Sequence, residues 1–272
     1  MLEWMWEKKN GISFITVPAW NQQGIDIAFT GRNGGASEAP FNTLNLGLHV
    51  GDRNELVLEN RRRVMQLFEQ DIEQMVCCQQ VHGSRVVSVT RKQRGCGSVD
   101  MKNWLTDTDG MVTNQPGVYL AAFYADCIPV FLFDPIKKCI GLAHSGWKGT
   151  MGRIAVNTVN IMEQDFNCQK SDIQVLIGPG IGSCCFEIKG DLAAKAIAEF
   201  GQFRDIISKE KNDKYRWNLP QTIYHMLIER GIKPENVSMT GLCTSCHTDL
   251  FYSYRKENGI TGRMGAFMGI RD

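Results

Sequence analysis

The sequence predicts a mixed α/β (α+β) fold in a single domain, and three observations lead to this prediction. Short runs rich in apolar, β-branched and aromatic residues recur along the 272-residue chain. Several are apolar without interruption, as expected for strands buried on both faces. Amphipathic helical segments lie between them, but the two kinds of segment do not alternate regularly. This order favours mixed sheet layers covered by outer helices over a doubly wound parallel sheet.

Eight segments have the composition of strands, and four have helical periodicity. In the first helical segment, Val57, Val64 and Phe68 form an apolar stripe, with Asn60 and Arg61 at its margin. No repeat or linker divides the chain, so we expect one domain over residues 1–272. The predicted strands are 14–17, 25–30, 85–89, 117–124, 129–133, 139–143, 173–177 and 237–242, and the predicted helices are 54–70, 150–166, 191–200 and 219–230.

The composition excludes several classes of protein. Hydrophobic residues make up 43% and charged residues 22%, which is typical of a globular chain with a sizeable core. The formal net charge is only +1, so binding to nucleic acid is not expected. The longest apolar stretch, residues 118–133, is broken by Asp126 and Pro129, which disfavours a membrane span. With no secretory signal visible at the start, we expect a cytoplasmic protein.

The ten cysteines do not predict a disulfide framework. A chain of this length needs no covalent staples, and the expected compartment is reducing. Two of the pairs, Cys77-Cys78 and Cys184-Cys185, are adjacent and therefore poorly placed for a bridge within the pair. We expect most of the cysteines to be reduced, buried and hydrophobic in character.

Three polar interruptions of apolar or glycine-rich segments are candidates for chemistry. His82 precedes a turn glycine, Cys127 follows Asp126 inside the most apolar stretch, and His144 ends a strand before a glycine-rich turn. Two imidazoles and one thiolate suit Zn²⁺ with an open fourth position. The separations of 45 and 17 residues are not a local metal signature. Hydrogen-bonded loop histidines and a core thiol therefore remain an alternative.

Two segments could bind an anion. The turn after His144 leads into a helix through Gly146 and Gly149, and Lys148 adds positive charge, although an ordinary strand-to-helix turn would look the same. Arg61 lies at the margin of an apolar helical face, where its guanidinium could reach a partly buried phosphate. Arg62 and Arg63 fit a solvated basic face better.

Two further motifs have weaker functional implications. Residues 243–247 match the Cys-x-x-Cys-His pattern of covalent haem attachment, but such attachment requires export, so we do not expect haem. Residues 177–187 form a glycine-rich loop without the full dinucleotide-binding pattern. This loop could line the site, and Gly262-Arg263-Met264 could approach it.

Taken in order, these blocks resemble the YfiH/YlmD family of purine nucleoside phosphorylases, formerly described as polyphenol oxidases or laccases. The similarity extends over nearly the whole chain. It rests on Asn45-Leu46-Gly47, Asn60-Arg61, Gln80-Val81-His82-Gly83, Asp107-x-Asp109-Gly110, Ala125-Asp126-Cys127-x-Pro129, Ala143-His144-x-Gly146-Trp147-x-Gly149, Gly178-Pro179-x-Ile181, Phe251-x-Ser253-Tyr254-Arg255 and Thr261-Gly262-Arg263.

The resemblance implies a layered αββα sandwich and a catalytic zinc site on His82, Cys127 and His144. It also implies phosphorolysis of adenosine, inosine and methylthioadenosine, together with adenosine deamination, and it allows a homodimer. We expect Arg61 with Asn45 to bind phosphate. The usual zinc-deaminase signature is missing, so Asp126 is the first candidate for the general acid/base, although in a strand it would point away from Cys127.

Three alternative functions remain open. A copper-dependent polyphenol oxidase would need many imidazoles, and the chain has only five histidines, so Cu²⁺ at this site would be adventitious. A cysteine hydrolase or deamidase would use Cys127 as nucleophile and His144 as base, with the amides after His144 near the oxyanion. A non-catalytic zinc- or nucleoside-binding protein is the third.

Overall fold

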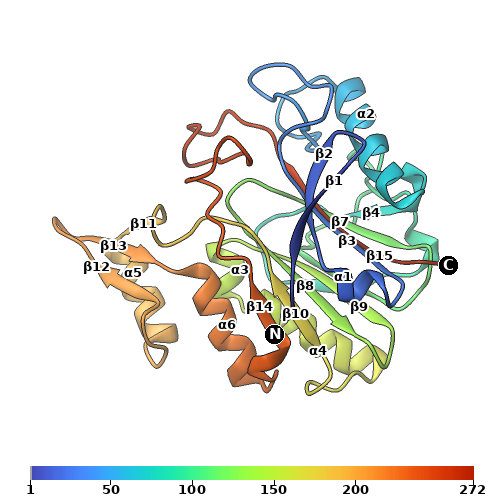
Figure 1. Cartoon of the computed structure of the whole chain (residues 1–272). Helices are drawn as coiled ribbons and strands as arrows, with labels where there is room; N and C mark the ends of the chain where they lie inside the picture. The colour runs from blue at the N-terminus through green and yellow to red at the C-terminus, as the bar shows by residue number, and fades with distance from the viewer. Residues whose placement is uncertain (1) are drawn as a thin grey trace.

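The computed structural model describes residues 2–272, which form two large sheets, a small sheet and covering helices (Figure 1). Residue 1 of the predicted domain lies outside this range. All neighbouring strands of the first sheet are antiparallel except β4 and β7, which are parallel. In spatial order this sheet contains β1 (Met5–Lys9), β2 (Ile12–Thr16), β3 (Ile25–Thr30), β15 (Met264–Ile270), β7 (Tyr119–Tyr124) and β4 (Met75–Cys77).

The second sheet is also mixed. Its two outer pairs, β14 with β10 and β6 with β5, are parallel. The pairs between them, β10 with β8, β8 with β9 and β9 with β6, are antiparallel. In spatial order it contains β14 (Val237–Met239), β10 (Gln174–Ile177), β8 (Ile128–Asp134), β9 (Cys139–Ser145), β6 (Gly110–Thr113) and β5 (Val86–Ser88).

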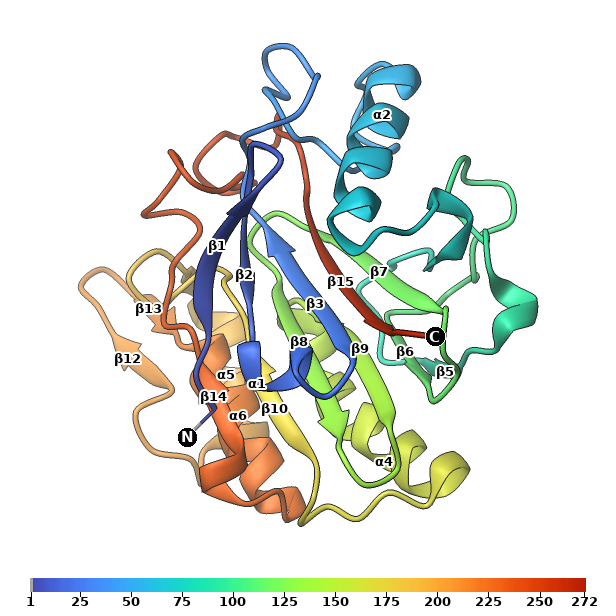
Figure 2. The ribbon, with the colours of Figure 1, turned by 45° about the vertical axis from the view of Figure 1, so that its right-hand side comes forward.

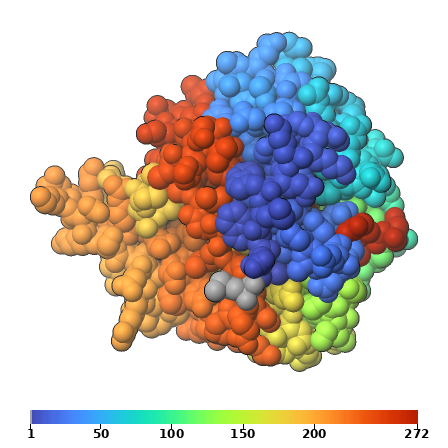
Figure 3. Space-filling model, viewed as in Figure 1, coloured from blue at the N-terminus to red at the C-terminus, as the bar shows by residue number. Residues whose placement is uncertain are grey.

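A small antiparallel sheet projects from the body of the molecule. It contains β11 (Glu187–Lys189), β13 (Lys214–Trp217) and β12 (Ile207–Lys209), and it is accompanied by α5 (Gly190–Phe200). The space-filling view shows this part as the orange arm at the left (Figure 3). Trp217 and Phe200 are fully buried at its base, so the arm shares the core of the second sheet.

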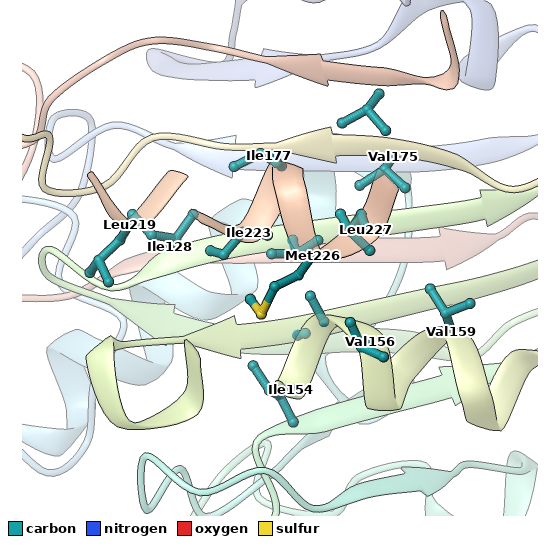
Figure 4. Packing of buried hydrophobic residues seen from close by; sticks show 14 of the residues in the cluster. Ile128, Ile154, Val156, Val159, Val175, Ile177, Leu219, Ile223, Met226 and Leu227 are labelled. Atoms are coloured by element: carbon teal, nitrogen blue, oxygen red, sulfur yellow. The ribbon is translucent and has the colours of Figure 1, made fainter. Parts of the chain in front are cut away.

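Three apolar cores define the layers. Phe29 and Leu120 of the first sheet meet Phe131 and Leu142 of the second between the two sheets. The outer face of the first sheet packs on α2 (Asn54–Met65). The outer face of the second packs on α4 (Ile154–Phe166) and α6 (Leu219–Arg230), whose apolar side chains interdigitate with those of β8 and β10 (Figure 4). The order helix, sheet, sheet, helix, visible in Figure 2, confirms the predicted mixed fold with outer helices.

The predicted helix over 150–166 is wrong at its start. The structure has α3 (Trp147–Met151) and then α4, because Arg153 adopts a left-handed φ of 58° between them. The predicted helix over 54–70 ends as α2 at Met65 and continues as a 3₁₀ turn. The remaining short helices are α1 (Pro18–Asn21), η1 (Gln66–Phe68), η2 (Ile72–Gln74), η3 (Arg91–Gln93) and η4 (Pro234–Asn236).

Sequence signals at both ends of α6 explain why its predicted range, 219–230, agrees with the structure. The Asn218 side chain accepts a hydrogen bond from the Gln221 amide, and Pro220 lies in the first turn. Gly231 ends the helix with a φ of 105°, a conformation that glycine adopts without a Cβ clash. Among the described helices, none is long and apolar enough to cross a bilayer.

The strand pairing brings several chain segments to one end of the sandwich. The end of β7 lies beside the start of β15, since Tyr124 pairs with Met264, and β4 ends beside Ala121 of β7. In the second sheet, the start of β8 and the end of β9 are paired through Ile128 and Ser145. The connections at this end therefore lie close together, and they contain the predicted site residues.

Candidate functional site

The structure brings His82, Cys127 and His144 together at this end of the sandwich. Their potential ligand atoms all lie within 4.8 Å of one another. The two imidazole rings meet edge to face, with centroids 4.9 Å apart. His82 is exposed, Cys127 is partly buried and His144 is buried, so the cluster is open to solvent on one side only.

Asp109 positions both histidines. Its carboxylate accepts hydrogen bonds from the amides of His82 (3.0 Å) and Gly83 (2.7 Å), and it lies 2.8 Å from Nδ1 of His144. The hydrogen bond to Nδ1 leaves Nε2 of His144 free toward Cys127 and fixes the ring orientation, as a carboxylate partner does for metal-binding histidines. In the sequence Asp109 stands out only as part of a motif, because a single acid at the start of a strand gives no sign of this role.

Asp126 holds the turn that carries Cys127, while its role as the general acid/base stays a prediction. It is 8% exposed and has a left-handed φ of 84°. Its carboxylate accepts hydrogen bonds from Thr244 Oγ1 (2.7 Å), Ser253 Oγ (2.8 Å) and the Arg255 amide (2.7 Å). These three hydrogen bonds join the turn to the segments that carry Thr244 and Ser253 and so fix its position.

Gly146 permits the close approach of the cluster to the start of α3. A Cβ at this position would lie 2.8 Å from Sγ of Cys127 and 3.1 Å from Cδ2 of His82. Both distances are shorter than van der Waals contact, so any side chain here would displace the cluster. The glycine therefore serves packing at the site. Because α3 has only five residues, the structure offers little helix dipole for the anion site expected there.

The charges within the cluster stabilise one another. Burial alone would raise the pKa of the Cys127 thiol, but His144 and His82 outweigh burial and lower this pKa to about 6. Burial disfavours a charged His144, whereas the Cys127 thiolate and Asp109 raise its pKa to about 9. Despite partial burial, the hydrogen bond from His144 keeps the pKa of Asp109 below its usual value. In metal-free protein, both shifts therefore favour a thiolate–imidazolium pair of Cys127 and His144.

A cavity of about 640 Å³ opens in front of the cluster. This volume lies in the range of about 300–1,000 Å³ that is typical for small-molecule sites. The lining contains aromatic and basic side chains that lie next to one another, since the Arg263 guanidinium is 5.8 Å from the centre of the Tyr254 ring. The aromatic lining includes Trp104, Phe123, Trp147 and Tyr254, and the basic lining includes Arg61 and Arg263.

Arg61 lines the cavity but is largely engaged within the protein. Its Nε donates to the Leu46 carbonyl (3.0 Å), and Nη1 donates to the carbonyls of Gly97 (2.8 Å) and Ser98 (2.7 Å). The guanidinium carbon lies 4.4 Å from the centre of the Phe123 ring. Among the described residues, no acceptor is found for Nη2, which leaves one edge of the guanidinium for a ligand.

Asn45 lies behind the cavity lining. It is fully buried, and its Oδ1 accepts hydrogen bonds from the amides of Gly47 (3.0 Å) and Arg263 (2.9 Å), while Nδ2 donates to Asp52 (2.9 Å). The described residues that line the cavity include Arg263 but not Asn45. The contacts of Asn45 therefore hold the backbone that carries Arg263.

Comparisons with known proteins agree with this architecture. Residues 26–271 match the family described as multi-copper polyphenol oxidoreductase laccase. The chain belongs to this family. Purine nucleoside phosphorylase YlmD of Bacillus subtilis is 36% identical over 253 residues, which cover 93% of this chain and 91% of that protein. The predicted YfiH/YlmD resemblance is confirmed.

Solved structures of family members show the same fold. YlmD from Geobacillus stearothermophilus superposes with a TM-score of 0.93 at 34% identity, covering 98% of each chain. YfiH from Bacillus licheniformis gives a TM-score of 0.92 at 34% identity, covering 98% of this chain and 99% of that one. The likeness extends over both sheets and the small arm.

The family description names copper, and two imidazoles with one thiol can hold either a zinc ion or a single copper ion. A tetrahedral zinc ion takes histidine and cysteine ligands, and a catalytic ion keeps one position open. The cluster offers two imidazoles, one thiol and an exposed side toward the cavity. Within the described residues, His49 lines the cavity but belongs to neither of the two groups that could hold a metal, and His225 and His247 also belong to neither group. The several imidazole ligands of a multi-copper centre therefore do not converge here.

Proposed function

We propose that this chain is a zinc-dependent purine nucleoside phosphorylase and that residues 1–272 act as one catalytic domain. Its substrates would be adenosine, inosine and methylthioadenosine with inorganic phosphate. The observation that carries the proposal is the His82–Cys127–His144 cluster at the wall of a cavity lined by both aromatic and basic side chains. The names of the relatives support this substrate class.

The aromatic side chains of the cavity suit the purine. Trp147 is 38% exposed and Tyr254 is 56% exposed, although large aromatic side chains are usually buried. Flat exposed rings at a cavity mouth can stack on a base, and such stacking is worth about 1–3 kcal/mol per base in nucleic-acid complexes. We therefore place the purine against these rings and the ribose toward the cluster.

The basic side chains suit phosphate. We assign Nη2 of Arg61 and the guanidinium of Arg263 to the anion, and we give Asn45 the indirect role of holding the Arg263 backbone. In phosphorolysis, an oxygen of phosphate forms a bond to C1′ while the C1′–N9 bond breaks and its electron pair goes to the purine. The base leaves as a neutral molecule after taking up a proton, and the two arginines hold the phosphate charge throughout.

The chain's own residues would hold the metal in place. His82, Cys127 and His144 supply its ligands, and Asp109 fixes the tautomer of His144 through Nδ1. When bound there, Zn²⁺ supplies Lewis acidity that polarises substrate groups and lowers the pKa of water to about 7, as phosphorolysis and adenosine deamination would each use. We therefore include adenosine deamination as a second activity.

A specific observation favours a cysteine hydrolase as the second candidate. The Cys127 thiol has a pKa of about 6 beside a protonated His144, which is the arrangement of an activated nucleophile. In such an enzyme Cys127 would attack a carbonyl or amidine carbon of its substrate. Zinc at the same residues would block this chemistry, so the two candidates require opposite effects of metal.

The state of the cysteines and the net charge indicate the compartment and the kind of ligand. The ten cysteines form no disulfide, as is typical of proteins in a reducing compartment, so we place the enzyme in the cytoplasm. We propose purine nucleosides and phosphate as its ligands, with no role for nucleic acid or membrane, because a net charge of +1 gives little overall attraction to polyanions.

A product assay tests the proposed function. The protein is incubated with adenosine in the presence and absence of phosphate, and adenine, inosine, ribose and ribose 1-phosphate are separated by chromatography. We expect adenine and ribose 1-phosphate in equal amounts, with phosphate required. Free ribose in place of ribose 1-phosphate would indicate a hydrolase, and no turnover of adenosine, inosine or methylthioadenosine would contradict the proposal.

A further inference from the structure

A second cluster of thiols lies outside the cavity described above. Cys184 and Cys185 precede β11, while Cys243 and Cys246 lie in the loop after β14. The four sulfur atoms are all within 4.8 Å of one another, and Sγ of Cys246 is 3.4 Å from the sulfurs of both Cys184 and Cys185. In Figure 1 the segment before β11 runs beside the red loop that follows β14.

The backbone of both loops is built to bring these thiols together. Gly180 forms a parallel bridge with Cys243, and the Thr244 amide donates to the Gly180 carbonyl (3.1 Å). The Gly182 amide donates to Sγ of Cys243 at 3.2 Å, and a Cβ on Gly182 would lie 3.2 Å from Sγ of Cys184. The thiol cluster is therefore a packed arrangement, in which a glycine leaves room for the sulfur atoms.

The spacing of the sulfur atoms fits a single tetrahedral metal ion. Four thiolates at the usual zinc–sulfur distance of about 2.3 Å have sulfur atoms about 3.8 Å apart. The observed separations, from 3.4 Å to at most 4.8 Å, bracket this value. An iron–sulfur cluster would bind the cysteines through several iron atoms and hold them further apart. The equal distances from Cys246 to two sulfurs also select no single disulfide partner.

Positive charge lies beside the cluster. Arg216 donates through Nη1 to the Cys184 carbonyl at 2.7 Å. Arg255 donates through Nη1 to the carbonyls of Cys185 (3.4 Å) and Glu187 (3.2 Å). A zinc ion with four thiolates carries a net charge of −2, which the two guanidinium groups and the Gly182 amide would offset.

We propose that Cys184, Cys185, Cys243 and Cys246 bind one Zn²⁺ in a closed tetrathiolate site that ties the cavity wall together. A site with four protein ligands has no open position, so its role is structural. Ile181 and Phe186 on one loop line the cavity, and Thr244 on the other loop holds Asp126 beside Cys127. The ion would thus join two loops that shape the cavity and anchor the small sheet. This proposal does not depend on the proposed enzyme activity.

The experiment counts bound metal in matched variants. Each protein is purified under reducing conditions, incubated with zinc, freed of excess metal and analysed by mass spectrometry for zinc per chain. We expect two equivalents for the wild type, one for Cys184→Ser/Cys246→Ser, and one for His82→Ala/Cys127→Ala. Cys96→Ser is the control and should retain two, because Cys96 belongs to neither group.

Cobalt substitution provides a readout that does not depend on counting. Co²⁺ held by four thiolates absorbs intensely in the visible and near ultraviolet, and this spectrum should persist in His82→Ala/Cys127→Ala. It should disappear in Cys184→Ser/Cys246→Ser, which places serine only at exposed positions and should fold. The proposal is overturned if the wild type and the Cys184→Ser/Cys246→Ser variant bind the same amount of zinc, or if peptide mapping of the reduced, zinc-treated protein finds these cysteines in disulfides.

Discussion

The two thiol-containing clusters of this molecule differ in what surrounds them. His82, Cys127 and His144 face a cavity, and a buried carboxylate holds one of the imidazoles. The second cluster lies between two loops and offers only sulfur ligands, with Cys184 and Cys246 exposed and Cys243 buried. A mixed donor set with an open side suits chemistry on a ligand, whereas four thiolates without an open side suit a structural ion. The difference shows that the surroundings of a cysteine, more than its presence, indicate its role.

The sharpest test of this difference removes one thiol from each cluster. Cys127→Ala should abolish phosphorolysis and one equivalent of bound zinc, because it deletes a ligand that faces the substrate. Cys184→Ser should leave phosphorolysis measurable. Initial rates with adenosine and phosphate, together with zinc content, provide the comparison. Equal loss of activity in both variants, with both proteins folded, would mean that the two clusters do not have separate roles.

Thiol reactivity should separate Cys127 from a buried neighbour. In metal-free protein Cys127 has a pKa of about 6, whereas burial raises the pKa of Cys77 to about 11, although both residues line the cavity. Thiolate is the reactive form, so near neutral pH Cys127 should be alkylated at least about a hundredfold faster than Cys77. Alkylation of Cys127 should decline as pH falls through about 6.

Peptide mapping after timed treatment with iodoacetamide measures both rates. Zinc should protect Cys127 by coordinating its thiolate. If Cys127 in metal-free protein reacts with a midpoint near the ordinary thiol pKa of about 8.5, the thiolate–imidazolium pair does not form.

The carboxylate behind His144 should matter less than a ligand but more than a surface acid. Asp109→Asn removes the negative charge that orients His144 and accepts the amides of His82 and Gly83, so zinc affinity or activity should fall about 10–100-fold. The control is Asp107→Asn, two residues earlier and exposed, which should change little. Zinc affinity is measured by competition with a chromogenic chelator. A normal affinity and rate in Asp109→Asn would remove Asp109 from the site.

The phosphate assignment predicts a selective defect. Arg61→Ala should weaken the use of phosphate, because losing a charge-assisted hydrogen bond costs about 1.5–3 kcal/mol, or roughly one to two decades in affinity or turnover. Arg62→Ala should have little effect, since Arg62 is exposed on the other side of α2. Deamination needs no phosphate, so the ratio of inosine to adenine formed from adenosine should rise in Arg61→Ala.

The internal hydrogen bonds of Arg61 make a stability control necessary for the Arg61→Ala experiment. Arg61 also donates to the carbonyls of Leu46, Gly97 and Ser98, so its removal should lower stability as well. Thermal unfolding is therefore measured alongside, and Arg263→Ala provides a second cavity arginine. A parallel loss of both products in Arg61→Ala, with zinc still bound, would show that Arg61 supports the whole site and does not act on phosphate in particular.

The smallest effect on catalysis is expected from the second cluster. Cys184→Ser/Cys246→Ser should lower the thermal midpoint, because a bound ion stabilises only the folded state, while kcat at low temperature should change little. Differential scanning calorimetry with and without zinc measures this shift. The comparison is made at zinc concentrations that fill the His82–Cys127–His144 cluster in both proteins. If zinc then raises the thermal midpoint of the variant as much as that of the wild type, the second cluster contributes no stability.

Much of the fold could be predicted from the sequence because its central strands are apolar along their whole length. β7, β8 and β9 are buried at every position and fall within the predicted strands or close to them. β15 was missed, although it is central in the first sheet. Two of its residues are glycines, which disfavour strands. In the structure Gly265 and Gly269 make room for the rings of Phe267 and Tyr119, a tertiary contact that local preference does not contain.

His82, Cys127 and His144 could be proposed from residue type and resemblance, but the carboxylates that hold these residues in place could not. Asp109 and Asp126 are both single acids at strand boundaries, and only the fold distinguishes the one that holds His144 from the one that holds a turn. The second cluster was missed for a related reason. Neither Cys184-Cys185 nor the Cys-x-x-Cys at 243–246 indicates a four-cysteine site by itself. Their pairing depends on the bridge between Gly180 and Cys243.

The most direct test of the central claim is the metal dependence of the reaction itself. Protein stripped with a chelator and then titrated with zinc is assayed for adenine and ribose 1-phosphate formed from adenosine and phosphate. The account predicts that stripping abolishes both products and that zinc restores them in equal amounts, but not in His82→Ala/Cys127→Ala. Full formation of both products by the stripped protein, or faster turnover after stripping, would contradict a zinc-dependent phosphorylase.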